Sequence, residues 1–252
     1  MGARASPISR VNPFLDATDS IADPAVLARL SSTHGYLFLR NLAPTATVNL
    51  LRGQVLEQLA RRGWLDDRAP RSEAVAHRDA ASHATRDELI AFQGDVQISP
   101  TFSELRRDPR ILSVLEAVLG APPVAGYGDV CRLAFPRDLA RTTAPHQDHF
   151  YTRKSTSLWT VWVPLGDCPS TLGGLAVLPG SHVGGLRAHD GGEGEARFVV
   201  LPDDTMWSSN NYCVGDVLMF NAVTVHGARP NVTADRIRIS ADFRFQPAPA
   251  DG

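Results

Sequence analysis

The second half of the chain is a series of short apolar, β-branched or aromatic runs separated by Gly, Pro, Asp and Asn. From about residue 126 onward, no helical period interrupts these runs, which lie at residues 129–135, 157–165, 175–178, 217–220 and 236–246. Short strands with turn signals between them are typical of an antiparallel sandwich or barrel. The sequence therefore predicts a β core over residues 126–246.

The first half carries helix signals instead. Asp23-Pro24 and Asp108-Pro109 each place a capping carboxylate and a first-turn proline before an apolar segment, and a glycine follows each segment. Apolar residues share one helical face over residues 45–62. These signals predict a helix-rich support over residues 21–125.

The remaining N-terminal segments have weaker patterns. Residues 36–39 form a compact apolar run that predicts a strand, and a further helix is expected near Arg86. Residues 63–84 show little pattern and are expected to form a mobile loop, and residues 1–20 a loose arm. We expect the whole chain, residues 1–252, to form a single domain.

Composition excludes several classes of protein. The chain has 252 residues, 25 basic and 27 acidic groups and 43% hydrophobic residues, so it can bury a core and is not a nucleic-acid binder by bulk charge. No apolar run approaches the ~20 residues that span a bilayer, and no hydrophobic segment follows the N-terminal arginines. Three widely spaced cysteines favour a reducing, cytoplasmic location over a disulfide framework. The eight histidines direct the search for a metal site to imidazoles and carboxylates.

One histidine and one carboxylate stand two positions apart before a strong strand segment. In extended backbone, His146 and Asp148 would face the same way, and His226 follows 80 residues after His146. Two histidines and one carboxylate on one face of an iron form the facial triad of non-haem Fe(II) oxygenases, which leaves positions open for other ligands. A second such pair, His77 and Asp79, lies in the unpatterned segment without a suitably spaced partner histidine, and we interpret it as surface.

The last β segment alternates strictly between polar and apolar residues. One face carries Arg236, Arg238, Ser240, Asp242 and Arg244. An inward arginine beside a hydroxyl group would bind a carboxylate through two parallel hydrogen bonds. The same alternation also fits a half-exposed edge strand with solvated arginines, so the pattern alone leaves both interpretations open.

Five blocks carry a resemblance to a known family: His146-Gln-Asp148, residues 159–167, residues 173–182, residues 215–220, and residues 226–231 together with Arg238-Ile-Ser240. In this order they resemble the phytanoyl-CoA dioxygenase family of Fe(II)- and 2-oxoglutarate-dependent oxygenases. Residues 34–40 are similar to the family's first strand, so the resemblance covers most of the chain. It implies a mainly β fold, with a double-stranded β-helix core of jelly-roll or cupin-like type and a helical N-terminal half.

The resemblance also implies roles for individual residues. It places iron on three ligands, and 2-oxoglutarate on an arginine with help from a serine and an aromatic side chain that alternatively packs in the core. In this sequence the ligands are His146, Asp148 and His226, and the cosubstrate residues are Arg238, Ser240 and Trp162.

Two departures from the family pattern bear on the cosubstrate. The family's arginine usually follows the distal histidine by eleven positions, where this chain has Ile237; a one-residue insertion restores the match to Arg238, and Arg236 is the rival. The family often has a serine two positions after the distal histidine, where this chain has Ala228. One hydrogen bond to the cosubstrate is therefore expected to be missing or supplied from elsewhere.

The implied function is a hydroxylase that uses Fe(II), 2-oxoglutarate and O2 on an unactivated C–H bond and releases succinate and CO2. Its expected substrate is a small or medium organic metabolite of bacterial secondary metabolism, such as antibiotic biosynthesis. Asp148 is present where related halogenases have Gly or Ala, which favours hydroxylation over chlorination. Desaturation, epoxidation or ring closure at the same iron, a non-catalytic metal-binding β-barrel, and a cupin-type oxygenase without 2-oxoglutarate are the alternatives.

Substrate contacts are expected outside the iron site. The candidates come from three segments with aromatic or amide side chains: His149, Phe150, Tyr151, Phe92, Gln93, Gln97 and Trp207. Lys154 is the only lysine and no basic cluster stands out, so neither a CoA-type nor a nucleotide ligand is expected. We likewise expect no nucleic-acid or membrane partner.

Overall fold

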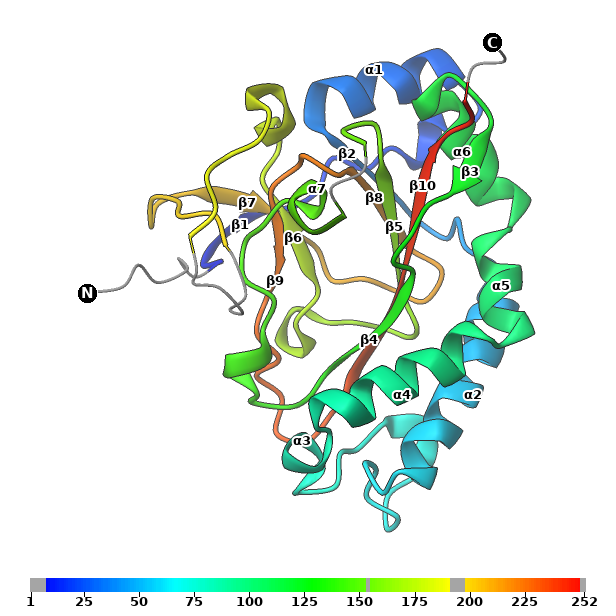
Figure 1. The fold of residues 1–252 in the computed structure, drawn as a ribbon, viewed down its shortest axis with the longest axis vertical. Coiled ribbons are helices and arrows are strands. Elements are labelled where there is room, and N and C mark those ends of the chain that lie inside the picture. Colours follow the sequence, from blue (N-terminus) through cyan, green and yellow to red (C-terminus); the bar gives the residue numbers. More distant parts are fainter. Residues whose placement is uncertain (1–7, 153–154, 191–197, 250–252) are drawn as a thin grey trace.

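Figure 1 shows a computed structural model of the chain, which describes residues 8–152, 155–190 and 198–249. The first seven residues of the expected arm, part of the loop after residue 184, and Lys154 lie outside this range. The helices are α1 (Pro24–His34), α2 (Thr45–Arg61), α3 (Ala80–His83), α4 (Arg86–Gln97), α5 (Pro100–Arg106), α6 (Pro109–Leu119) and α7 (Asp148–Thr152). Short 3-10 turns lie at Thr18–Ser20, Arg71–Glu73, Leu139–Arg141, Ser170–Leu172 and Ser181–Gly184.

The helices α1 and α6 begin and end where the sequence predicts. The Asp23 side chain accepts hydrogen bonds from two backbone N–H groups of the first turn of α1, and Asp108 does the same for α6. Gly35 and Gly120 follow these helices in the left-handed conformation that ends them. Each capping carboxylate stabilises its helix by about 1 kcal/mol.

The strands form two sheets within the described residues. The strands are β1 (Arg10–Asn12), β2 (Tyr36–Leu39), β3 (Pro123–Ala125), β4 (Val130–Ala134), β5 (Trp159–Pro164), β6 (Leu175–Val177), β7 (Met206–Ser208), β8 (Val217–Asn221), β9 (His226–Ala228) and β10 (Arg238–Pro247). The larger sheet has the order β2-β8-β5-β10-β3, with β4 also paired to β10, and the smaller has the order β1-β7-β6-β9. All pairs within them are antiparallel except β1 with β7.

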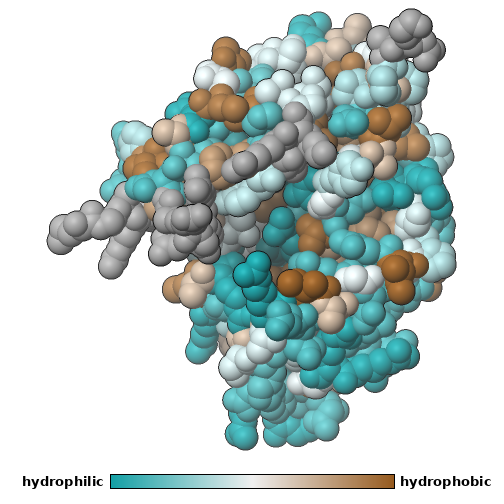
Figure 2. Space-filling view, viewed as in Figure 1, coloured by the Kyte–Doolittle hydropathy of each residue, from teal (hydrophilic) through white to brown (hydrophobic). Residues whose placement is uncertain are grey.

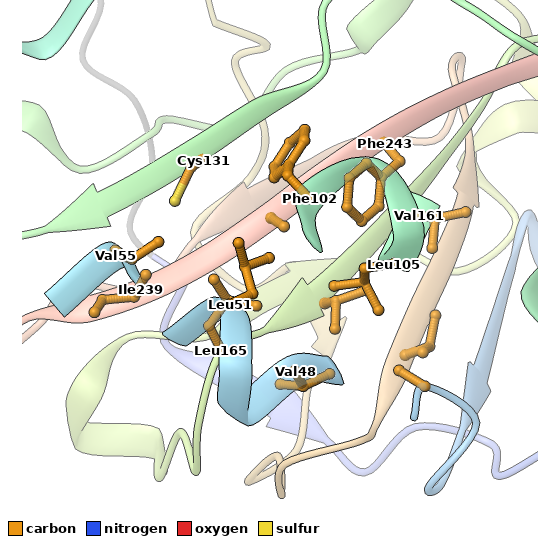
Figure 3. Packing of buried hydrophobic residues seen from close by; sticks show 14 of the residues in the cluster. Val48, Leu51, Val55, Phe102, Leu105, Cys131, Val161, Leu165, Ile239 and Phe243 are labelled. Carbon is orange, nitrogen blue, oxygen red and sulfur yellow. The ribbon is translucent and has the colours of Figure 1, made fainter. Parts of the chain in front are cut away.

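The strict alternation of the last strand separates two environments. The apolar face of β10 packs against α2 and α5, where Ile239 and Phe243 meet Leu51 and Phe102 (Figure 3). Phe243 is fully buried, and its ring centroid lies 4.8 Å from that of Phe102. Truncating such a side chain to alanine costs about 3–5 kcal/mol. The polar face of β10 therefore points away from the helices, into the space between the sheets.

A second apolar cluster lies between the two sheets. It takes residues from β2, β5 and β8 of the larger sheet and from β6 and β9 of the smaller one, including Phe38, Trp162, Val177 and Ala228. The two sheets therefore face each other across a shared interior, as in a jelly roll. The polar side chains of β10 enter this interior at the edge of the cluster.

The expected class, mainly β with a helical N-terminal half, is met in part. The helices α1 to α6 all precede residue 120, but β1 and β2 come from the same half and belong to the two sheets. The arm expected over residues 1–20 thus supplies strand β1, and the helix α5 forms where no helix was predicted. No described helix is long and apolar enough to cross a membrane.

The prediction of a mobile loop over residues 63–84 is wrong. Trp64, Ala74 and Ala80 are each about 1% exposed and belong to the core beneath the larger sheet. The backbone of Ala76 donates to Asp235, which ties the segment to the start of β10. Its buried residues are too irregularly spaced to give a periodic signal, which is why the sequence pattern does not reveal the packing.

Candidate active site

Three side chains that are distant in sequence meet at the edge of the smaller sheet. His226 lies on β9, and an isolated β-bridge pairs it with His146 through backbone hydrogen bonds of 2.8 and 3.0 Å. Asp148 is the first residue of α7, so the backbone between His146 and Asp148 turns instead of continuing as the extended strand assumed from sequence. The turn still brings the carboxylate to both imidazoles, because the β-bridge places the two histidines next to each other.

The ligand atoms of these residues converge. The Asp148 Oδ1 atom lies 3.5 Å from His146 Nε2 and 3.6 Å from His226 Nε2, and the three ligand atoms lie within 4.8 Å of one another. The Nδ1 atom of each histidine is hydrogen-bonded to a backbone carbonyl, that of Ala144 at 2.8 Å and that of Thr224 at 3.0 Å. An Nδ1–H donor leaves the Nε2 lone pair free for a metal ion. We call His146, Asp148 and His226 the triad.

The protonation states of His226 and Asp148 suit a divalent cation. Burial, with the neighbouring His146, lowers the pKa of His226 to about 3, so its imidazole is neutral at pH 7. Burial alone would raise the pKa of Asp148, but Arg244 and the two histidines hold it well below its usual range. A metal ion therefore need not displace a proton from either group. The donor set of two imidazoles and one carboxylate fits Fe(II).

The second oxygen of Asp148 is held by the protein. Its Oδ2 atom accepts a hydrogen bond of 2.6 Å from the Thr160 hydroxyl and lies 3.2 Å from Arg244 Nη2. Arg244 also donates to the carbonyl of Gly128. These contacts leave Oδ1 as the oxygen that faces the histidines, so the carboxylate is oriented for single-oxygen binding.

The same guanidinium group begins a chain of alternating charges. Arg244 Nη2 lies 3.9 Å from Asp242 Oδ2, and that oxygen accepts a hydrogen bond of 2.6 Å from Arg132 Nε. The chain therefore runs from Asp148 through Arg244 and Asp242 to Arg132, with two carboxylates and two guanidinium groups. Every carboxylate in it has at least one cation beside it, which offsets much of the cost of burial.

A second buried arginine lies on the same face of β10 but has no carboxylate of a described residue beside it. Arg238 is 4% exposed, and its one hydrogen bond within the described residues is a 2.7 Å bond from Nη1 to the Ser240 hydroxyl. Its Nε atom and the Nε1 atom of Trp162 are buried with no hydrogen-bond partner in the part of the chain that the structure describes, and the guanidinium carbon lies 5.9 Å from the Trp162 ring. Burying an uncompensated cation costs free energy, so the arrangement fits an anionic ligand with a carboxylate near Arg238.

The rival arginine lies on the surface. The Arg236 side chain is 48% exposed and pairs with Glu73 at 2.7 Å. Its register places it before β10, outside the interior that Arg238 enters. The structure thus separates the two arginines that the sequence pattern left as alternatives.

A cavity of about 1060 Å³ opens beside the triad, between α4, β4 and α7. The face seen in Figure 2 is hollowed in this region. Both His146 and Asp148 line the cavity, together with Gln93, Gln97 and Tyr151, three of the residues expected to contact substrate.

The other expected substrate contacts lie elsewhere. Phe92 is fully buried beside Trp64, and Trp207 is 2% exposed in an apolar cluster around β7. His149 and Phe150 follow Asp148 on α7 but do not line this cavity. The aromatic character that singled out these residues reflects packing as readily as binding.

Sequence reasoning missed three residues of the site. Thr160 and Arg132 carry no motif, because strand pairing with β10 brings each of them to the site: Thr160 lies opposite Arg244, and Arg132 lies opposite Ser240. Arg244 stood on the polar face of the last strand, but its role depends on the approach of α7. A sequence signal existed only for Arg244, in the strict alternation of β10.

The jelly-roll sheets and the triad of two histidines and one carboxylate together define a mononuclear non-haem iron oxygenase. The comparison with known families narrows this class. The phytanoyl-CoA dioxygenase (PhyH) family model matches residues 31–240, and the chain belongs to this family. It is therefore a dioxygenase of the hydroxylase type whose cofactors are Fe(II) and 2-oxoglutarate.

Similar proteins include enzymes of bacterial biosynthesis. The 1-deoxypentalenic acid 11-beta-hydroxylase of Streptomyces exfoliatus is 29% identical, over 94% of this chain and 86% of the relative. The epimerase SnoN, solved with Fe3+, alpha ketoglutarate and nogalamycin RO, is 25% identical with a TM-score of 0.63, over 90% of this chain and 85% of SnoN. EvdO2 of Micromonospora carbonacea, solved with 2-oxoglutarate, is 20% identical with a TM-score of 0.62 over 97% of this chain and 96% of its own, which shows a shared fold.

Proposed function

We propose that this dioxygenase hydroxylates an unactivated C–H bond of a small or medium organic metabolite, with His146, Asp148 and His226 as ligands of Fe(II). In this proposal 2-oxoglutarate binds through its distal carboxylate to Arg238 and Ser240. The observation that carries the proposal is the pairing of two features among the described residues: three converging ligand side chains beside a cavity, and a buried arginine without a carboxylate partner.

Fe(II), 2-oxoglutarate and O2 together supply the oxidation of the substrate C–H bond, with decarboxylation of 2-oxoglutarate to succinate and CO2. The chain supplies binding and orientation. The carbonyls behind each histidine fix the imidazole planes, and Thr160 with Arg244 keeps one oxygen of Asp148 turned toward them. His146, Asp148 and His226 would thus hold the metal from one side of the cavity, and three protein ligands would leave room for the cosubstrate and O2.

Arg238 supplies the fixed point for the cosubstrate. Its guanidinium group is held by Ser240 and lies near the indole ring of Trp162, whose Nε1 atom offers a further donor. Burial removes competing water, so an ion pair formed there is stronger than at the surface. The nearby Ala228 offers no hydroxyl group, and Ser240 is the hydroxyl that stands beside the arginine.

Two other outcomes of the chemistry are weighed against hydroxylation. SnoN is named an epimerase, and another similar structure, SnoK, is named a carbocyclase. The first of the relatives described above is named a hydroxylase, and Asp148 occupies the carboxylate position, so hydroxylation is the reaction we propose. A non-catalytic binding barrel has no use for an uncompensated arginine at this depth, and neither does a cupin oxygenase without 2-oxoglutarate.

The test is uncoupled turnover. Purified protein with Fe(II), ascorbate, 2-oxoglutarate and O2 should release succinate without added substrate, at a low rate. His226→Ala should abolish this release, whereas His77→Ala, which alters the exposed copy of the His-x-Asp pattern, should not change it. Equal succinate release from the wild type and His226→Ala would contradict the proposal.

Three broader expectations join this proposal. We propose that the two sheets form a double-stranded β-helix and that residues 1–252 act as one catalytic domain. The three cysteines are all unpaired in the structure, which supports a reducing, cytoplasmic location. The names of the bacterial relatives support a role in secondary metabolism such as antibiotic biosynthesis, with a small-molecule partner and no nucleic acid.

A further inference from the structure

The large cavity beside the triad contains few charges that are free to meet a ligand. Asp129 pairs with Arg106 at 2.8 Å, and Arg141 pairs with Asp138 at 2.5 Å while it also donates to two backbone carbonyls. Asp129 and Arg141 line the cavity, but their charges are already neutralised by these partners. They contribute shape and hydrogen bonding, and they do not select the charge of a ligand.

Arg132 differs from these residues. Its Nε atom donates to Asp242, and neither terminal nitrogen donates a hydrogen bond to another described residue. The side chain is 38% exposed and lines the cavity. A guanidinium group bound through Nε to one carboxylate can still offer its two terminal nitrogens to a second carboxylate.

The charge balance of the site also favours an anionic group on the ligand. Asp148, Arg244, Asp242 and Arg132 contribute two negative and two positive charges, and Arg238 adds one more positive charge. Fe(II) and the two carboxylates of 2-oxoglutarate cancel each other. The loaded site therefore keeps one positive charge, and among the described residues that line the cavity the accessible cation is Arg132.

Among the described residues, the rest of the lining has no further free cation and is largely apolar or neutral. It includes Val130, Ala140, Ala144 and Phe198, with amide and hydroxyl groups from Gln93 and Thr142. Such a wall suits a hydrocarbon body, and a cavity of this size accommodates a multi-ring skeleton. One guanidinium group does not match the several phosphate charges of a CoA ester or a nucleotide.

From these observations we propose that the substrate is an apolar molecule with a single free carboxylate, and that Arg132 binds this carboxylate and so determines specificity. The inference rests on the proposed function, because it assigns the substrate of the same site. The anchor is separated from the triad by Asp242 and Arg244, so the carboxylate binds beside the metal and does not compete with 2-oxoglutarate for it.

The test uses three apolar acids and their methyl esters: adamantane-1-carboxylate, dehydroabietate and decanoate, with decanoyl-CoA as a further probe. Dissociation constants are measured by calorimetry on protein loaded with Ni(II) and 2-oxoglutarate, which does not turn over. The wild type should bind at least one acid about ten- to a hundredfold more tightly than its ester, the size of a charge-assisted hydrogen bond from a guanidinium group to a carboxylate.

In Arg132→Leu this preference should fall to about one, through weaker binding of the acid and unchanged binding of the ester. Arg110→Leu, which alters an exposed arginine on α6 paired with Asp108, should keep the wild-type preference. Because Arg132→Leu removes a partner of the buried Asp242, the double variant Arg132→Leu/Asp242→Asn serves if the single variant does not fold. It removes both charges of the pair and should lose the preference in the same way.

Four results would overturn the inference: an ester that binds as tightly as its acid throughout the panel, an acid preference that survives in Arg132→Leu, tighter binding of decanoyl-CoA than of decanoate, or no binding of any acid. Succinate release separates this failure from failure of the proposed function. If the wild type releases succinate without an acid preference, only the substrate assignment is wrong; if it neither releases succinate nor binds 2-oxoglutarate, the proposed function is wrong.

Discussion

The inner face of β10 carries two buried arginines in contrasting surroundings. Arg244 lies within 3.2 Å of Asp148 and 3.9 Å of Asp242, and it donates to a backbone carbonyl. Arg238, six residues earlier, has a serine hydroxyl as its hydrogen-bond partner within the described residues and a tryptophan ring nearby. The two side chains are similarly buried, at 5% and 4% exposed.

The difference separates what a buried charge does for the fold from what it does for a ligand. A paired arginine stabilises the groups that it contacts, because removing it would leave buried carboxylates uncompensated. An unpaired arginine stabilises nothing in the free protein, and its burial is offset only when an anion binds. We therefore expect the Arg244 end of β10 to govern the metal site and stability, and the Arg238 end to govern 2-oxoglutarate.

The largest expected effect is on stability at the paired end. Arg244→Leu should lower the free energy of unfolding of the metal-free protein by about 3–5 kcal/mol, because it leaves Asp148 and Asp242 buried with one cation fewer. Urea denaturation measures this change. The exposed Arg110→Leu serves as control and should change stability by less than about 0.5 kcal/mol. A loss of unfolding free energy in Arg244→Leu no larger than in this control would contradict the stabilising role assigned to Arg244.

The next effect is on ligand binding at the unpaired end. Arg238→Leu should raise the dissociation constant of 2-oxoglutarate about 100-fold, while the free energy of unfolding of the metal-free protein stays equal or rises. Calorimetric titration of the Ni(II)-loaded protein gives the first quantity, and urea denaturation gives the second. Arg236→Leu should affect 2-oxoglutarate little, and a larger effect there than in Arg238→Leu would reassign the carboxylate site to Arg236.

The hydroxyl groups of Thr160 and Ser240 allow a smaller change at each end of β10 to be compared. Thr160→Val removes the 2.6 Å hydrogen bond to Asp148 and should weaken metal binding about tenfold with little change in 2-oxoglutarate affinity at saturating metal. Ser240→Ala should do the reverse. Competition of Co(II) with a chromophoric chelator measures the first affinity. The two ends would not be separable if both variants lowered both affinities equally.

The smallest predicted effect is a gain in affinity for 2-oxoglutarate. Ala228 lines the same small cavity as Arg238, at the position where the family often has serine. Ala228→Ser should add a hydrogen bond to the cosubstrate and tighten 2-oxoglutarate binding about fivefold, which corresponds to about 1 kcal/mol. Calorimetry again provides the measurement, with Ala222→Ser, at a buried residue outside that small cavity, as the matched control. Unchanged or weaker binding in Ala228→Ser would place the carboxylate away from β9.

The sequence predicts those features of the fold and the site that depend on residues close together in the chain. Asp23 and Asp108 cap helices within their own turns, and the alternation of β10 separates its two faces, so both features can be predicted from a short stretch of sequence. The triad was recognised from the spacing of its residues and the family resemblance. Its assumed extended geometry was wrong, because the start of α7 at Asp148 depends on contacts with distant strands.

The contacts around the triad cannot be predicted from a short stretch of sequence. Thr160 reaches Asp148 from the neighbouring strand β5, and Arg132 reaches Asp242 from β4, so both depend on strand register that no local pattern encodes. Residues 63–84 failed for a similar reason: their core contacts come from irregularly spaced residues such as Trp64 and Ala74. At positions fixed by tertiary register, sequence reasoning identified neither the residues nor their partners.

The separate roles of the two ends of β10 are tested most directly by an anaerobic titration. Protein loaded with Fe(II) is titrated with 2-oxoglutarate, and the charge-transfer absorption band is measured. We predict a band in the wild type, no band at any 2-oxoglutarate concentration in His226→Ala, and in Arg238→Leu the same band at about 100-fold higher concentration. A band that persists in His226→Ala would contradict the role of His226 as a metal ligand. A band that forms in Arg238→Leu at wild-type concentrations would contradict the role of Arg238 in binding 2-oxoglutarate.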